Sequence, residues 1–359
     1  MDEGFFLLVA VVVLAILFDY INGFHDTANA IATVVSTNVL PPRTAIMLAA
    51  LFNFGGAFMG VEVAKTIGGD IADPKSITQT VVVAALIGAI FWNLVTWYFG
   101  IPSSSSHALI GGLVGAVLCH AMLDDGKGFG TAVHQLITFK GESNGLLKVV
   151  KALVISPLMG LIGGFFIMIG LLWIVRRSAP ERVNRQFRHL QLFSASAMAL
   201  SHGSNDAQKA MGIVTMALIS YYNVHRENVP TWLNLQKMDV PLWVIVACAT
   251  AMALGTAAGG WRIMKTMGHK IIKMKPIHGF AAESAGAIVI LGASHIFHAP
   301  VSTTHVISAS IMGVGASKRV SAVRWGLAGN IAVAWVLTIP ISALVAGLLY
   351  VALRPILGA

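Results

Sequence analysis

The chain has 359 residues, of which 56% are hydrophobic and only 11% are charged, and its mean hydropathy is +0.78. Soluble domains carry about 25% charged residues, so this composition excludes a large water-exposed globule and indicates a polytopic membrane protein. The net charge of +9 does not indicate nucleic-acid binding, because the basic residues lie in loops between apolar stretches. Cys119 and Cys248 stand singly in apolar stretches, so we expect neither a disulfide nor a metal cluster.

A helix that spans the membrane needs about 20 apolar residues, and this length predicts ten segments. The first five cover residues 4–36, 43–64, 79–99, 104–121 and 148–175. The other five cover residues 191–219, 241–261, 281–298, 302–316 and 321–351. The segments at 104–121 and 302–316 are short and follow a proline, so we expect half-helices of re-entrant hairpins there.

The distribution of basic residues predicts the orientation. Residues 176–190 hold five arginines against one acidic residue, Glu181, so this loop is expected in the cytoplasm. Counting spans outward from it places the loops at 122–147 and 220–240 outside, and returns the basic loops after residues 261 and 317 to the inside. Both chain termini are then expected outside.

Two of the apolar segments contain polar motifs of one kind. Residues 20–30 read Tyr-Ile-Asn-Gly-Phe-His-Asp-Thr-Ala-Asn-Ala, and residues 201–210 read Ser-His-Gly-Ser-Asn-Asp-Ala-Gln-Lys-Ala. Asp26 and Asp206 occupy the same place in the two motifs, at an offset of 180. Polar groups in a membrane interior are costly, and interrupted helices often build ion or solute sites. We therefore expect each helix to be broken at its motif, near residues 22–26 and 202–206.

A second pair of motifs recurs at an offset of 198. Residues 101–108 read Ile-Pro-Ser-Ser-Ser-Ser-His-Ala, and residues 299–306 read Ala-Pro-Val-Ser-Thr-Thr-His-Val. Each half of the chain holds five segments, an odd number, so two copies of one unit enter the membrane in opposite senses. This arrangement is typical of secondary transporters that bind substrate near the midplane. We expect a first transmembrane repeat, a basic cytoplasmic linker and a second, inverted repeat, at residues 1–178, 179–190 and 191–359.

The Pro-Ser motifs have the chemistry of an anion site. A proline suits the first turn of a helix, where its missing N–H costs nothing. The free N–H groups at a helix N-terminus carry about half a positive charge and bind anions. Two such ends that face each other near the midplane suit a tetrahedral oxyanion. The candidate residues are Ser103, Ser104, Ser105, Ser106, Ser302, Thr303 and Thr304.

Asp26 and Asp206 would repel such an anion unless each binds a cation, a proton or the O–H of a protonated oxyanion. Phosphate keeps an O–H near neutral pH and sulfate does not, so a carboxylate that needs this donor favours phosphate. The same carboxylates are candidates to carry a coupling ion, because an unpaired charge within a membrane is too costly to be incidental.

The four motifs together resemble the inorganic phosphate transporter (PiT) family, over nearly the whole chain. The first copy, Gly23-Phe-His-Asp-Thr-Ala-Asn-Ala30, is similar to the family signature Gly-Ala-Asn-Asp-Val-Ala-Asn-Ala. The resemblance implies an ion-driven symporter of inorganic phosphate in the bacterial inner membrane and a homodimer. His25 replaces the usual asparagine and Lys209 adds a charge, and both are similar to the low-affinity bacterial branch that couples phosphate to protons rather than to sodium.

The predicted sites follow from the motifs and the resemblance together. Phosphate is expected to bind Asp26, Asn29, Asn205 and Asp206 in addition to the Ser and Thr residues of the two Pro-Ser motifs. The coupling ion, H⁺ or Na⁺, is expected at Asp26, Asp206, His25, Lys209 and Glu283, the last a lone carboxylate in an apolar span. His107 and His305 close the Pro-Ser motifs as proton carriers or as histidines satisfied by backbone groups.

Other functions fit parts of this pattern. Sulfate or a metal–phosphate complex would suit the same fold, and a passive channel would share the same polar lining. An intramembrane hydrolase would use Ser, His and Asp, but such an enzyme needs one catalytic set and this chain duplicates the set. No Walker-type motif indicates an ATPase. No cofactor and no dedicated metal site are expected.

Overall fold

The computed structural model describes residues 3–70, 77–138, 145–224, 235 and 237–358, and this part of the chain contains helices and no strand. The first seven helices are α1 Glu3–Ser36, α2 Pro42–Gly56, α3 Glu62–Asp70, α4 Gln79–Phe99, α5 Ser105–Leu123, α6 Phe129–Thr138 and α7 Gly145–Val175. The other six are α8 Pro180–Val224, α9 Leu242–Ala258, α10 Trp261–Lys265, α11 Pro276–Leu291, α12 Thr303–Lys318 and α13 Trp325–Leu357. Short π-helical segments follow α10 and α11, at Thr266–Lys270 and Gly292–Ile296.

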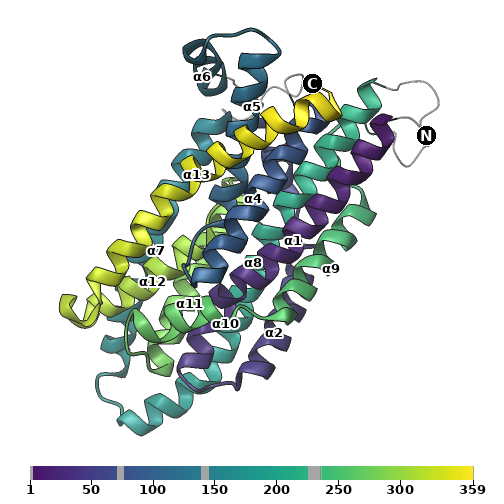
Figure 1. The fold of residues 1–359 in the computed structure, drawn as a ribbon. Coiled ribbons are helices and arrows are strands. Elements are labelled where there is room, and N and C mark those ends of the chain that lie inside the picture. Colours follow the sequence, from purple (N-terminus) through teal and green to yellow (C-terminus); the bar gives the residue numbers. More distant parts are fainter. Residues whose placement is uncertain (1–2, 71–76, 139–144, 225–234, 236, 359) are drawn as a thin grey trace.

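The helices form one elongated bundle of a multi-pass membrane protein (Figure 1). Among the described residues, six helices are individually long and apolar enough to cross a membrane, or seven if α9 and α10, bent by 58°, count as one span. The N-terminal end of α1 and the C-terminal end of α13 lie at one end of the bundle, and the start of α8 lies at the other. The two ends of the chain therefore share one side, opposite the basic stretch that begins α8.

The predicted breaks in the polar motifs are wrong. α1 continues without interruption from Glu3 to Ser36, and α8 runs for 45 residues from Pro180 to Val224. A polar motif does not need to unwind the helix that carries it when neighbouring helices supply hydrogen-bond partners to its side chains. Most of the motif side chains find such partners, so the backbone keeps its own helical hydrogen bonds.

Three other boundaries differ from the prediction. The segment at 43–64 is two helices, because the chain turns at residues 57–61 between α2 and α3. Of the residues expected as a linker, 179–190, all but the first lie in the first turns of α8. The segment expected as an outside loop, 122–147, contains α6. Most of the loop at 220–240 lies outside the described residues.

Glycines in the polar motifs allow backbones to touch. A Cβ at Gly23 of α1 would collide with backbone atoms of Met252 and Thr256 in α9, and a Cβ at Gly203 of α8 would collide with the backbone of Asn53 in α2. Close approach of this kind is a general use of small residues between membrane helices. The two glycines therefore act in packing rather than in breaking the helices.

The last helix of each half packs against a short helix from the other half. α13 lies along α5, where Gly111 and Gly115 leave no room for a Cβ against α13. α7 lies along α12, where Gly160 and Gly164 are equally tight against the backbone of Val306 and Ser310. Both Pro-Ser motifs are thus held in place by helices that are distant in sequence.

Gly203→Ala tests the role of the motif glycines. We expect it to destabilise the folded protein by about 1–3 kcal/mol, because the added methyl group overpacks a backbone contact. Gly170→Ala on the exposed side of α7 is the matched control, since a Cβ there meets nothing within 4 Å, and should be neutral or stabilising by up to about 1 kcal/mol. Thermal unfolding in detergent measures both. Equal melting temperatures for the two variants would contradict the packing role.

Candidate functional site

The two Pro-Ser motifs begin helices α5 and α12. Ser104 caps α5 by accepting a hydrogen bond from the backbone N–H of His107 (3.1 Å), and Ser302 caps α12 in the same way at His305 (3.2 Å). Pro102 therefore precedes the cap by two residues instead of occupying the first helical turn as predicted, and Pro300 does the same. These two serines have a capping role, while their neighbours remain free for other contacts.

The N-termini of α5 and α12 meet inside the bundle. The Ser106 hydroxyl donates to the Val301 carbonyl oxygen (3.1 Å). The rings of His107 and His305 are 4.4 Å apart, and His305 also stacks on Trp335 of α13. Because the first N–H groups of each helix have no intrahelical partner, the meeting point is rich in hydrogen-bond donors.

Asp26 of α1 contacts both motifs. The Ser105 hydroxyl donates to one carboxylate oxygen (3.2 Å), and Thr304 of the second motif lies 3.4 Å from the other. His25 Nδ1 is 2.5 Å from Asp26 Oδ1. Asp26 is buried, so this histidine is its nearest possible counter-ion.

Asp206 of α8 is fully buried and has a fixed cation. Lys209 Nζ is 2.5 Å from Asp206 Oδ1, and the Asn205 amide donates to the same oxygen (2.6 Å). The other oxygen accepts a hydrogen bond from Thr303 (3.3 Å), and His202 Nε2 lies 3.4 Å from it without a hydrogen bond. An ammonium group enclosed at this distance neutralises the carboxylate.

His25 and Asn205 occupy equivalent positions and make equivalent contacts. His25 Nε2 lies 3.1 Å from the Thr96 hydroxyl and 3.4 Å from the Ser103 hydroxyl. Asn205 Oδ1 accepts from Ser294 (3.2 Å) and from the backbone N–H of Val301 (3.3 Å). The contacted residues are themselves related by the offset of 198, so each polar motif contacts the Pro-Ser motif of its own half.

Asn29 and Lys209 also occupy equivalent positions, but their contacts differ. The Asn29 amide donates to Thr303 (3.2 Å) and Thr304 (2.9 Å), and its oxygen has no partner among the described residues. Lys209 instead pairs with Asp206. Asn29 therefore belongs to the shared centre and presents a free acceptor there.

Glu283 of α11 lies in a separate polar cluster. Its carboxylate accepts hydrogen bonds from Thr33 (2.5 Å), Ser194 and Gln191 (3.1 Å). Thr33 follows Asp26 by seven residues on one helix face, a distance of about 10 Å along α1. The structure thus places Glu283 apart from the two aspartates, in a fully buried cluster where no basic group contacts it among the described residues.

Three buried groups have the spacing of a cation site. One ligand atom from each of Asp26, His202 and Asp206 lies within 4.8 Å of the others, and no other such trio occurs in the described part of the chain. His202 was not among the predicted residues. Carboxylates suit hard cations, and imidazole suits transition metals. Lys209 and His25 already contact the two carboxylates, so a cation could bind this trio only if those side chains moved aside.

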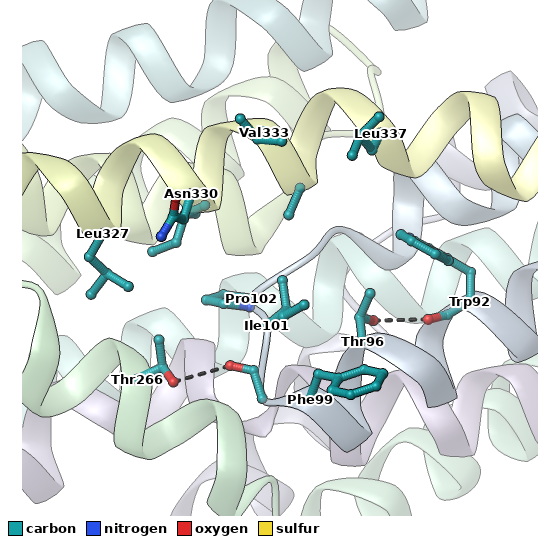
Figure 2. Close-up of a pocket in the computed structure, with 13 residues that line it drawn as sticks. Trp92, Thr96, Phe99, Ile101, Pro102, Thr266, Leu327, Asn330, Val333 and Leu337 are labelled. Atoms are coloured by element: carbon teal, nitrogen blue, oxygen red, sulfur yellow. Dashed lines mark hydrogen bonds between the residues drawn. The ribbon is translucent and has the colours of Figure 1, made fainter.

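A cavity of 460 Å³ lies behind the first Pro-Ser motif, between the end of α4, the Gly100–Pro102 turn and α13 (Figure 2). Its lining is mostly apolar, with Asn330 of α13 and Thr266 as polar groups. Thr96 lines it too, and that residue accepts a hydrogen bond from Ser103 (2.7 Å). The cavity therefore adjoins the site through Thr96 and is not the meeting point itself.

Several residues of the buried network escaped the sequence prediction. Thr96, Ser194 and Ser294 are single hydroxyl residues in apolar or mixed helices, and nothing in their local sequence distinguishes them. Asp19 directly precedes the predicted motif on α1 and is fully buried. Asp19 carried a usable signal, because it is a carboxylate within a long apolar segment, as Glu283 is.

Comparison with known proteins agrees with this geometry. The model of the phosphate transporter family matches residues 22–346. A probable low-affinity inorganic phosphate transporter of Bacillus subtilis is 48% identical over 99% of this chain and 100% of its own length. One of Rhizobium meliloti is 50% identical over 97% of each chain.

A solved structure titled "The sodium-dependent phosphate transporter" shares the fold, with a TM-score of 0.78 over 98% of this chain and 99% of that one, at 23% sequence identity. The family match and the close relatives both extend across the two halves of the chain, including all four motifs. The chain belongs to the phosphate transporter family, and it is a membrane transporter of inorganic phosphate and not an enzyme.

Proposed function

We propose that the chain is a secondary symporter that moves inorganic phosphate across the cytoplasmic membrane and is driven by the proton gradient. The observation that carries this proposal is the buried centre where the helix starts of α5 and α12 meet two aspartates, each already paired with a basic side chain. Such a centre can accept an anion without an external metal cation.

The donors around the aspartates favour phosphate over sulfate. Ser105 donates to Asp26, and Thr303 donates to Asp206. When an oxyanion takes these hydroxyl donors, each carboxylate loses a partner. Phosphate replaces that partner with its own O–H, whereas sulfate leaves a buried acceptor unpaired at a cost of about 1–3 kcal/mol. The names of the close relatives support the same cargo.

The basic groups beside the aspartates favour protons as the coupling ion. Lys209 pairs with Asp206, so a sodium ion there would compete with an ammonium group. His25 Nδ1 lies 2.5 Å from Asp26 Oδ1, so a basic side chain also occupies one side of the first aspartate, where a sodium ion would need an oxygen ligand. The protein of the similar solved structure is named as sodium-dependent. Because the two sequences are only 23% identical, that similarity supports the fold and not the coupling ion.

The repeated contacts support an inverted-repeat architecture with both termini outside. Residues 1–178 and 191–359 form the two repeats in this proposal, and the first turns of α8 join them on the cytoplasmic side. Equivalent residues at the offsets of 180 and 198 make equivalent contacts. A homodimer is part of the proposal because the resemblance implies it.

Uptake by proteoliposomes with imposed gradients tests the coupling ion. We expect phosphate to accumulate above its external concentration under an inward proton gradient, up to about tenfold per coupled proton and pH unit. A sodium gradient at fixed pH should leave the phosphate uptake unchanged. Vesicles without a gradient are the control, since a passive channel would equilibrate phosphate in every condition. Accumulation that requires sodium would refute the proton assignment.

Serine and threonine variants test the anion site. Ser105→Ala and Thr304→Ala should each weaken phosphate binding by about 10- to 150-fold, because a hydrogen bond to a charged group contributes about 1.5–3 kcal/mol. The double variant should depart from additivity, since both residues contact Asp26 from opposite helices. Phosphate titration of the purified proteins measures all three.

The capping serines are the matched controls for that series. Ser104→Ala and Ser302→Ala should lower stability by about 1 kcal/mol and leave the dissociation constant of the folded protein unchanged. Equal losses of affinity in capping and non-capping variants would show that the hydroxyls act only through helix stability.

Lys209→Asn tests the fixed cation, because it installs the residue that stands at the equivalent position, Asn29. The buried carboxylate of Asp206 then lacks its partner, which typically costs about 3–5 kcal/mol. We expect phosphate uptake to fall sharply and to be partly restored by sodium or lithium, which can take the place of the ammonium. Lys209→Arg keeps the charge as a control. Full sodium-independent uptake by Lys209→Asn would show that the pair is dispensable.

A further inference from the structure

α1 carries a second buried carboxylate that the transport site does not use. Asp19 is fully buried, and neither of its carboxylate oxygens has a nitrogen or oxygen hydrogen-bond partner among the described residues. It precedes Asp26 by seven residues, so it lies on the same face of α1 about 10 Å nearer the N-terminus. Its counterpart in the second repeat is Ala199, so this carboxylate is not part of the duplicated set.

A second unsatisfied group accompanies it. Asn22 is fully buried, and within the described chain both its amide atoms lack partners. Residues three apart on a helix are neighbours, with Cβ atoms about 5–6 Å apart. Two adjacent polar side chains with open hydrogen-bonding capacity are rare in a protein interior, because each costs about 1–3 kcal/mol. Their presence indicates a place where a small ligand is bound and released.

The surroundings of Asp19 indicate which ligand. From α9 the Cys248 thiol interacts with the carboxylate, and from α8 Asp206 and Lys209 are within electrostatic range. The buried residues of α4 include no titratable side chain. On α1 itself the adjacent titratable residue is Tyr20, whose side chain is exposed, and the next ones are His25 and Asp26. Asp19 thus faces one carboxylate, one ammonium and one thiol, in a region closed to water.

An ionised carboxylate without partners is untenable in such a region, because burial of an unpaired charge costs several kcal/mol or more. Lys209 cannot neutralise Asp19 fully while it is held 2.5 Å from Asp206. A hydrated metal ion would need more oxygen ligands than one carboxylate and one amide. A proton needs no further ligands and removes the charge outright.

We propose that Asp19 is a proton-binding site between the outer side of the membrane and the phosphate site. A hydronium ion of the external water gives its proton to one carboxylate oxygen, so one O–H bond of hydronium breaks, one O–H bond forms on Asp19, and a water molecule remains. When the proton leaves, the ionised carboxylate competes with Asp206 for the Lys209 ammonium. Protonation of Asp19 therefore determines how strongly Lys209 is held beside Asp206 at the phosphate site. This proposal rests on the proton coupling and the orientation proposed above.

Two readouts in proteoliposomes separate coupling from transport. Exchange of labelled for unlabelled phosphate at equal pH requires binding and movement but no net proton flux, whereas accumulation under an inward proton gradient requires both. Asp19→Asn mimics the protonated carboxyl at nearly constant volume. We expect it to exchange phosphate at a rate close to that of the unmodified protein and to accumulate none above the external concentration.

Asp19→Glu keeps a titratable group and should keep gradient-driven accumulation. Asp125→Asn, the same substitution at a solvent-accessible carboxylate after α5, should change neither readout. Undiminished accumulation by Asp19→Asn would overturn the proposal. Loss of phosphate exchange in both Asp19→Asn and Asp19→Glu, with both proteins still folded, would also overturn it, because such a loss would show that Asp19 has a structural role. Failure of the proton coupling itself is distinguishable, because the unmodified protein would then not respond to the proton gradient.

Discussion

The pairing of buried carboxylates with internal partners is the constraint on which the structure depends. Asp26, Asp206 and Glu283 all lie where water cannot solvate them. Asp26 and Glu283 are each stabilised by groups from two other helices, and Asp206 is stabilised by Thr303 of α12 and by Lys209 on its own helix. Removing one partner from a buried charge costs more than the pair contributes when intact. The helices that supply those partners must therefore stay in register, and the small residues between them permit the close approach that this requires.

The same constraint explains why α1 and α8 remain continuous. A broken helix exposes backbone N–H and C=O groups that need partners in the membrane interior. In this protein the helix ends with free backbone groups inside the bundle are those of α5 and α12, where Ser104 and Ser302 each accept a hydrogen bond from one of the free N–H groups. The long helices bring charged side chains, and the short helices bring free N–H donors and hydroxyls. The site is built by combining the two kinds of element.

Much of this arrangement was predictable from sequence, because duplication made the functional positions visible. The offsets of 180 and 198 identified both aspartates and both Pro-Ser motifs, and loop charge located the basic stretch that begins α8. The continuity of α1 was not predictable, because partners such as Thr96 lie more than 70 residues away from His25. Ser194 and Gln191 were missed for the same reason: their importance comes from Glu283, which a distant segment contributes.

The two halves of the chain differ in how they pair their aspartates. Lys209 lies beside Asp206 on the same helix, whereas His25 lies beside Asp26. Asn29 stands where a second lysine would be, and it contacts Thr303 and Thr304 instead of an aspartate. The centre is therefore asymmetric although the motifs that build it are duplicated. The same substitution at the two aspartates would remove different contacts, because Asp206 is the partner of an ammonium group and Asp26 is the partner of an imidazole.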